Sequence, residues 1–534
     1  MRRWRSGTTL APWHWVGMLT VASLALRLWR IDFQSFWLDE AHTAFYINGQ
    51  TPGVIFERFT RPGENGPFYY LMLLPWREMF GGGEASLRGF SVVAATLAVP
   101  VTWLAFRRLS APREALLTTA LVATAPYLTW YAQEAKMYAL ALLAGVTSLW
   151  LFVEALHHGG AWRWVAYGVA ALASIYVHFF ALLSIGAHAL AAAVMAWPDR
   201  RRLGAAWLTV GLVLTPVLAW QAIAIGRDVA GSGATMSSGE MTLATRVGVL
   251  AYAYAMNVTP APFPAVVFAS VSMAMFGTMS AVRPTWVAAR AAGVGTVWRR
   301  GLPVPARGLL AVAMLAWSPF VAHALAMGAL GAGLFADRYF VAVVPPLYGI
   351  AAIGFGAITD RSRLAGAALA VVVLPIGAWA TAYQVTVPIK DDFRRAMALY
   401  RGGKGERDAV VPVPHILSYP VGYHSAPGLD VVVVDMERPP VDFAAKFDGR
   451  TGVWVITNVP DRYVPLHDLR EWLAGHATLA SDDTVTGGVG VQHWLLDGGC
   501  DAVPGPDGAW EAPTFARPCV EGLRSTPELT VVRP

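Results

Sequence analysis

Two adjacent carboxylates, Asp39 and Glu40, follow the first long apolar run of the chain, which covers 13–31. Their segment, 36–42, is also rich in aromatic side chains. A carboxylate at the edge of the hydrocarbon region is costly to keep charged, so such acids are candidates for function. An interfacial acid beside an aromatic belt would give the same pattern. We take Asp39 as the centre of a predicted active site, with Glu40 as its neighbour.

A carboxylate in this place can act as a general base, which is worth roughly a hundred- to ten-thousand-fold in rate. Its counterpart would be a cation such as Lys136 or Arg338, which neutralises the charge that grows on a departing phosphate. If the base lies on one face of the reacting carbon and the departing phosphate on the opposite face, a single displacement inverts the configuration at that carbon. The residue types therefore suit transfer of a group from a phosphate-bearing lipid to an external acceptor.

Other polar residues stand in turns between apolar runs and form the rest of the predicted donor and acceptor site. Because these turns fall on one predicted membrane face, we expect their side chains to converge on Asp39. The candidates are Arg61, Glu64, Asn65, Tyr69, Gln133, Glu134, Lys136, Tyr138, His178, Asp337 and Arg338.

Composition places the chain in the membrane. Of its 534 residues 55% are hydrophobic and 14% charged, and the mean hydropathy is +0.46, whereas a soluble domain has roughly 25% charged residues. The formal net charge is +6, and the arginines lie mostly in short loops between apolar runs. That distribution is typical of membrane topology, so nucleic-acid binding is excluded. The run at 13–31 is long for a signal peptide and is expected to remain as an anchor.

Eleven apolar runs have the length of a membrane span, about 17 to 25 residues. A twelfth segment, 67–80, is shorter and charged near its end, so we predict an interfacial helix there. The eleven runs are 13–31, 87–106, 114–131, 137–156, 162–177, 179–197, 203–226, 261–282, 307–330, 339–358 and 363–384.

Arginines concentrate in one set of loops, whereas the opposite loops are richer in acids. The positive-inside rule then predicts a cytoplasmic N-terminus and an external Asp39. The predicted membrane domain is 1–384, with a first external loop at 32–86. An odd number of spans puts a second domain, 385–534, on the external side.

The predicted external domain alternates strands with helices and is expected to be a small α/β domain. Strands are predicted at 409–411, 431–434 and 452–457, and helices at 391–400 and 466–474. Cys500 and Cys519 are the chain's two cysteines. In an oxidising compartment they would form a disulfide, although two unpaired thiols would fit the sequence as well.

Six motifs, taken in order and spacing, resemble the GT-C superfamily of integral-membrane glycosyltransferases. More narrowly, the chain is similar to the bacterial branch that includes protein O-mannosyltransferases and the lipid A aminoarabinose transferase. The motifs lie at 37–41, 66–70, 87–88, 133–138, 176–180 and 337–340.

The resemblance implies a function, a donor and a location. It implies that Asp39 is the catalytic base and that a polyprenyl-phosphate sugar is the donor of a hexosyl or pentosyl group. Glu134, Lys136, His178 and Arg338 match motifs expected to contact donor or acceptor. The acceptor would be a glycan, lipid or protein of the bacterial cell envelope, and the chain would lie in the inner membrane.

Two positions depart from the family pattern. The usual pair of prolines before the interfacial helix is here Gly66-Pro67, and the basic residue of the motif at 133–138, commonly Arg, is Lys136. Lysine binds phosphate as a point charge and lacks the bidentate fork of arginine. We therefore expect the donor headgroup or the acceptor to differ from those of better-known members.

Other interpretations of the same residues stay open. Proline breaks within apolar runs, such as Pro126 and Pro216, would suit a transporter or lipid flippase, although the paired broken helices of transporters are not evident. Asp39, Glu40 and Glu134 together have the oxygen ligands that a divalent cation prefers. No cofactor is otherwise predicted.

Overall fold

Long apolar helices dominate the chain because a helix satisfies all of its backbone polar groups internally, as a membrane requires. The computed structural model describes residues 11–61, 64–197, 199–232, 242–257, 259, 264–292, 302–330, 335–425, 429–434, 441–460 and 463–496. Contacts divide the chain into a first unit, 1–34 with 39–389, and a second unit, 35–38 with 390–534.

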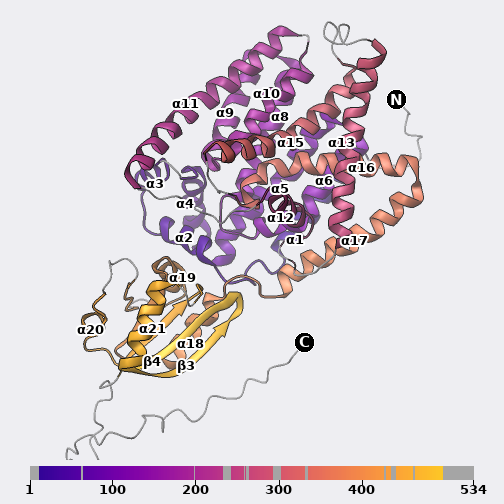
Figure 1. Cartoon of the computed structure of the whole chain (residues 1–534). Helices are drawn as coiled ribbons and strands as arrows, with labels where there is room; N and C mark the ends of the chain where they lie inside the picture. Colours follow the sequence, from indigo (N-terminus) through magenta and orange to yellow (C-terminus); the bar gives the residue numbers. More distant parts are fainter. Residues whose placement is uncertain are drawn as a thin grey trace, which may run out of the picture. The chain divides into compact units, whose positions relative to one another are not determined.

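Nine of the eleven predicted spans fall on one helix each of the first unit, and 114–131 and 339–358 are each divided between two helical elements (Figure 1). Within the described residues, six helices are long and apolar enough to cross a membrane. The helices that carry the predicted spans are α1 (Pro12–Leu28), α5 (Glu84–Leu109), α6 (Pro112–Thr124), α7 (Pro126–Ala132), α8 (Tyr138–His158), α9 (Ala161–Val177), α10 (Ala181–Met195), α11 (Arg200–Ser232), α13 (Pro264–Ala292), α15 (Val304–Leu330), η1 (Asp337–Val343), α16 (Val344–Arg361) and α17 (Arg363–Thr386).

Several details differ from the prediction. The predicted span 114–131 is broken into α6 and α7 at Ala125, because the residue before a proline is disfavoured in the helical region. The helices α2 (Leu38–Ile47), α3 (Pro52–Phe59) and α12 (Leu243–Met256) were not predicted. The predicted interfacial helix is α4 (Phe68–Phe80), and α2, α3 and α4 gather together in Figure 1.

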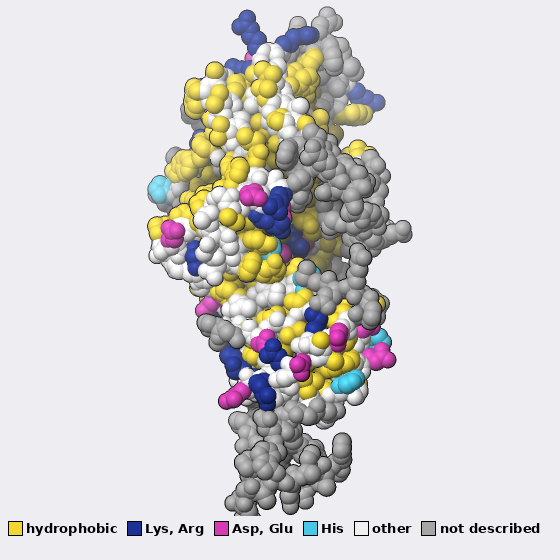
Figure 2. Space-filling view, turned by 90° about the vertical axis from the view of Figure 1, so that its left-hand side faces the viewer, with side chains coloured by type: hydrophobic (Ala, Val, Ile, Leu, Met, Phe, Trp, Pro, Cys, Tyr) yellow, Lys and Arg dark blue, Asp and Glu magenta, His cyan; other side chains and the backbone are white. Residues whose placement is uncertain are grey.

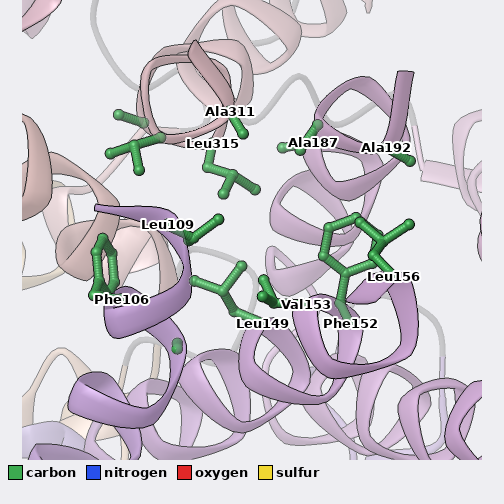
Figure 3. Close-up of a cluster of buried hydrophobic side chains, with 14 of the residues drawn as sticks. Phe106, Leu109, Leu149, Phe152, Val153, Leu156, Ala187, Ala192, Ala311 and Leu315 are labelled. Atoms are coloured by element: carbon green, nitrogen blue, oxygen red, sulfur yellow. The ribbon is translucent and has the colours of Figure 1, made fainter. Parts of the chain in front are cut away.

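The bundle core forms where α5, α8, α10 and α15 pack together. Figure 3 shows side chains from these four helices directed toward one another, and all of the labelled ones are buried. Glycines allow the closest helix contact: a Cβ on Gly354 of α16 would overlap the backbone oxygen of Met273 on α13. Small residues allow such backbone approaches between membrane helices. The core therefore combines interlocked large side chains with close backbone contact.

The outer faces of the bundle remain apolar. Large hydrophobic side chains such as Leu212, Leu325 and Val371 are about 70% exposed. Figure 2 shows hydrophobic side chains over much of the visible face of the helical unit. Contiguous apolar surface of this extent is not typical of a water-soluble protein. The first unit is thus a multi-pass membrane structure.

The second unit is built on a four-stranded sheet of order β1-β2-β4-β3. β1 and β2 are parallel, whereas β4 is antiparallel to both β2 and β3. Two separate apolar clusters pack with the strands. The elements are α18 (Phe393–Gly403), β1 (Asp408–Val413), η2 (His415–Leu417), α19 (Ser418–His424), α20 (Phe443–Lys446), β2 (Gly452–Thr457), α21 (Val464–His476), β3 (Ala477–Val485), η3 (Thr486–Gly488) and β4 (Val489–Leu496).

The predicted strands and helices of this unit match only in part. Strands at 409–411 and 452–457 and helices at 391–400 and 466–474 correspond to β1, β2, α18 and α21. The predicted strand 431–434 was wrong, because the structure has only a single bridge between Val410 and Val431. The β3–β4 hairpin was not predicted. Cys500 and Cys519 lie outside the described residues.

The predicted fold class is confirmed: an α-helical membrane protein with a small C-terminal α/β sheet unit.

Candidate active site

A fully buried ion pair joins Glu40 of α2 to Arg88 of α5. Arg88 Nε lies 2.7 Å from Glu40 Oε1, and Arg88 Nη2 lies 2.8 Å from Oε2. These two parallel bonds make the bidentate arrangement in which charge-assisted hydrogen bonds are strongest. The backbone N–H of Ala135 also donates to Oε1 at 2.9 Å. Glu40 is therefore already engaged in holding the structure together.

The same arginine fixes the backbone that leads into α2. Arg88 Nη1 donates to the carbonyl oxygens of Ile31 at 2.9 Å and Gln34 at 2.8 Å. Glu40 lies in the first turn of α2. Arg88 thus holds the chain on both sides of the residues that enter this helix.

Asp39, the neighbour of Glu40, has a very different environment. Its side chain is half-buried and lies in the first turn of α2, where the partial positive charge of a helix N-terminus favours a carboxylate. Among the described residues, no hydrogen-bond or ion-pair partner contacts its carboxylate. The Asp39 carboxylate, unlike that of Glu40, is therefore not engaged in holding the described structure together.

Lys136 brings a buried cation next to Asp39. It lies in the turn between α7 and α8, and its Nζ is 3.4 Å from the backbone oxygen of Asp39. Burial disfavours the charged ammonium, but Tyr70 and Asp39 outweigh it and raise the pKa of Lys136. Lys136 is therefore a cation at neutral pH.

Arg338 is a second cation near Asp39. Three tyrosine hydroxyls bind Asp337, the residue that precedes it. The hydroxyls of Tyr127 and Tyr254 donate to the Asp337 backbone oxygen at 3.0 and 3.2 Å. Tyr131 donates to the Asp337 carboxylate at 3.0 Å. Arg338 itself is half-buried and interacts electrostatically with Asp39 and with the other cation. Asp337 thus anchors the turn from which Arg338 projects.

His178 is a buried neutral group of the same neighbourhood. Its ring lies 5.8 Å from the Tyr138 ring and 6.0 Å from the Tyr339 ring, centroid to centroid. Burial, assisted by Arg338 and Lys136, lowers the pKa of His178 to about 3. Its Nε2 has no hydrogen-bond partner within the part of the chain that the structure describes. A neutral imidazole of this kind can hydrogen-bond a substrate hydroxyl.

Gly66 explains one departure from the family pattern. Its φ is +95°, and a Cβ there would overlap the backbone oxygen of Tyr176 near the end of α9. Proline is locked near φ −65° and could not adopt this conformation. The glycine therefore lets the loop before α4 approach the segment that leads to His178.

Five residues define what we call the Asp39 cluster: Asp39, Tyr70, Lys136, His178 and Arg338. Glu134 and Tyr138, both buried, interact electrostatically with Arg338 and lie beside this cluster.

Other predicted site residues have contacts elsewhere. Tyr69 is fully buried against Tyr70 and Phe90. Gln133 Nε2 donates to the carbonyl oxygens of Arg27 and Trp29, both at 2.9 Å, and so closes the end of α1. Arg61 pairs with Glu57, Glu64 pairs with Arg58, and Asn65 is half-buried.

Three residues near Asp39 were not singled out from the sequence. Tyr70 lies next to the predicted Tyr69, and adjacent helix positions face different directions, which sequence alone does not resolve. Arg88 is a charge at the start of an apolar run, which is a signal for a buried role. His42 lies in α2, and burial together with Lys136 lowers its pKa to about 4.

The structure brings no additional ligands to the predicted divalent-cation site in the part of the chain that it describes. Among the described residues, no group of three or more His, Asp or Glu lies close enough together to hold a metal ion. Glu40, one of the three predicted oxygen ligands, is occupied by Arg88.

Comparison with known proteins gives matches at the level of structure. No protein-family model matches the chain. No curated protein matches it in sequence either.

Two solved structures illustrate the similarity. ArnT from Cupriavidus metallidurans bound to undecaprenyl phosphate has a TM-score of 0.53 and 14% identity, covering 90% of this chain and 98% of that one. The Archaeoglobus fulgidus oligosaccharyltransferase AglB, in complex with an inhibitory peptide and a dolichol-phosphate, has a TM-score of 0.50 and 12% identity, covering 90% and 74%. The chain therefore shares the fold of these two structures, as the motifs predicted.

The first testable consequence concerns the buried pair. Replacing Arg88 by Met leaves Glu40 buried without its partner, and breaking a buried pair in this way costs about 3 to 5 kcal/mol. We expect the Arg88→Met protein to unfold at a markedly lower temperature in detergent. The matched control is Arg108→Met, which removes a partly exposed pair with Glu154 and should change stability by less than about 1 kcal/mol. Equal effects of the two substitutions would contradict the assigned role of Arg88.

Proposed function

We propose that the chain is an inverting glycosyltransferase that moves a sugar from a polyprenyl-phosphate donor to an extracytoplasmic acceptor, with Asp39 as the general base. The observation that carries this proposal is the contrast between two adjacent acids. Glu40 is locked by Arg88, whereas the Asp39 carboxylate has no partner in the described structure and lies beside Lys136 and Arg338.

The two cations suit the donor side of the reaction. In a displacement at a sugar phosphate, negative charge grows on the departing phosphate, and fixed cations in a site of low dielectric constant stabilise it. Lys136 and Arg338 would bind this phosphate. The donor class is supported by the fold neighbours, of which ArnT binds undecaprenyl phosphate and the archaeal oligosaccharyltransferase binds a dolichol-phosphate.

The carboxylate suits the acceptor side. An acceptor hydroxyl oxygen bonds to the anomeric carbon while the bond from that carbon to the phosphate oxygen breaks. The hydroxyl proton passes to Asp39, and the electron pair of the broken bond leaves with the lipid phosphate. Because the nucleophile enters opposite the leaving group, the anomeric configuration inverts. Neutral His178 would hydrogen-bond a hydroxyl of either substrate.

The proposal includes a location and a division of roles. The chain would span the bacterial inner membrane with a cytoplasmic N-terminus, and residues 1–384 would carry catalysis. The C-terminal domain, 385–534, would face the same external side as Asp39. The group transferred would be a hexose or pentose, and the acceptor a glycan, lipid or protein.

The catalytic proposal is tested by replacing Asp39 with Asn. Membranes containing the chain are supplied with radiolabelled polyprenyl-phosphate sugars, and transfer to envelope acceptors is measured. Losing a general base should lower the rate roughly a hundred- to ten-thousand-fold, with little change in the unfolding temperature. Asp32→Asn, an exposed acid of the same loop, is the matched control and should retain the rate. Unchanged transfer by Asp39→Asn would refute the assigned base, and movement of the intact lipid without transfer would favour a flippase.

Sidedness is tested by labelling with an impermeant thiol reagent after Cys500 and Cys519 are replaced by Ser. We expect single cysteines at Gly53 and Thr478, both exposed, to be labelled from outside intact cells. A cysteine at Ala111, exposed in a loop of the opposite predicted side, should be labelled only after the membrane is opened. Protection of either external position would contradict the proposed orientation.

A further inference from the structure

Arg27 is a fully buried cation in the last turn of α1. Its guanidinium Nη2 donates to the carbonyl oxygen of Val122 in α6 at 2.8 Å. Among the described residues no carboxylate pairs with Arg27, and its Nε and Nη1 have no hydrogen-bond partner there. A buried charge is costly when no opposite charge accompanies it, so an arginine in this position is a candidate for a specific task.

The partner of Arg27 is a carbonyl group that its own helix cannot satisfy. In an α-helix the oxygen of one residue accepts from the N–H four residues later, which for Val122 would be the N–H of residue 126. That residue is Pro126, the first of α7, and proline has no N–H. Arg27 therefore supplies the donor that is missing where α6 ends and α7 begins. The carbonyl end of α6 also has a partial negative charge, which favours a cation.

The same turn of α1 also holds the other end of α7. Gln133, which directly follows α7, donates from Nε2 to the carbonyl oxygens of Arg27 and Trp29, both at 2.9 Å. The side chain of Arg27 thus binds the chain before α7, and its backbone binds the chain after α7. Since α7 is only 7 residues long and all of them are buried, these contacts tie the whole helix to the end of α1.

Both cations of the Asp39 cluster are connected to α7. Lys136 lies in the turn that follows it. From within α7, the hydroxyls of Tyr127 and Tyr131 donate to the backbone oxygen and the carboxylate of Asp337, both at 3.0 Å. Arg338 is the next residue in the chain. A movement of α7 would therefore displace the two cations together.

We propose that Arg27 is a positioning residue for the transfer reaction, acting through α7 on Lys136 and Arg338. This inference rests on the proposed function, in which those two cations bind the donor phosphate. A shift of about 1 Å in a group that contacts the substrate can cost on the order of a hundred-fold in rate. The Arg27 side chain is fully buried and directed to α6, so its effect on the donor is indirect.

The test measures binding of undecaprenyl phosphate to the full-length protein in nanodiscs. Undecaprenol, which lacks the phosphate, is the reference lipid. Arg27→Met removes the donor to Val122 and should weaken binding of undecaprenyl phosphate about ten-fold, whereas binding of undecaprenol should change less than about two-fold. Unfolding of part of the sample would lower the number of binding sites and leave their affinity unchanged.

Arg27→Lys tests whether the hydrogen bond to Val122 carries the effect. Because one guanidinium nitrogen makes that bond, a lysine that keeps one donor within reach should return the affinity to within about three-fold of the parent protein. Affinity as low as that of Arg27→Met would overturn the role assigned to this bond.

Arg30→Met is the matched control. Arg30 is exposed just beyond α1, and its guanidinium lies over the Phe33 ring at 3.9 Å from the centroid. The substitution therefore removes the same charge near the same end of α1 without touching α6 or α7. It should leave binding of undecaprenyl phosphate unchanged. An equal loss of affinity in Arg30→Met and Arg27→Met would overturn the positioning role.

Amide hydrogen exchange gives a readout that does not depend on the lipid. In Arg27→Met, exchange should rise at 126–138 and stay as in the parent protein in α8 and α10. Faster exchange throughout α5, α8 and α10 would show general loosening of the bundle and would overturn the proposal. Unchanged affinity together with unchanged exchange at 126–138 would overturn it as well.

The two proposals fail in distinguishable ways. If Lys136→Met and Arg338→Met bind undecaprenyl phosphate as tightly as the parent protein, the proposed donor site falls, whatever Arg27→Met does. If those two substitutions weaken binding but Arg27→Met does not, the positioning role alone is overturned.

Discussion

The buried pair of Glu40 and Arg88 is the interaction on which the candidate site depends. Two charges removed from water are tolerated only when they satisfy each other with good geometry, and here all contacts of the pair are short. Because the arginine also binds the backbone at Ile31 and Gln34, it ties the segment before α2 to α5. The pair therefore determines where α2 begins and where Asp39 is presented.

The candidate site contains polar groups that hold the backbone and others that are proposed to react. Glu40, Asp337 and Gln133 are occupied by hydrogen bonds that fix the backbone. Asp39, Lys136 and Arg338, the groups proposed to react, interact with one another electrostatically. A preorganised arrangement of this kind stabilises charge in a transition state without reorganising when the reaction occurs. The membrane bundle makes this possible because its helices bring turns from distant parts of the chain to one place.

Much of the fold follows from hydropathy, because helices that face lipid must be apolar and of spanning length. The charged turns were found for a related reason, since acids and cations are conspicuous among apolar runs. The sequence predicted Asp39 as the base, but it did not show that Glu40 pairs with Arg88. It named Tyr69 as a site residue, whereas Tyr70 is the one that interacts with Lys136. Both outcomes depend on tertiary packing. The β3–β4 hairpin was missed because β3 is an exposed edge strand with polar residues and lacks the buried alternation of a typical strand.

The central claim is that two adjacent acids have separate tasks, and the rate of sugar transfer per folded molecule tests it most directly. Asp39→Asn and Glu40→Gln are compared with the parent protein, with the folded fraction measured in the same samples. The account predicts that Asp39→Asn folds normally and loses transfer, whereas Glu40→Gln lowers the unfolding temperature and, because Asp39 is then held less well, lowers transfer per folded molecule by much less than Asp39→Asn does. Transfer that survives in Asp39→Asn and disappears in fully folded Glu40→Gln would contradict it.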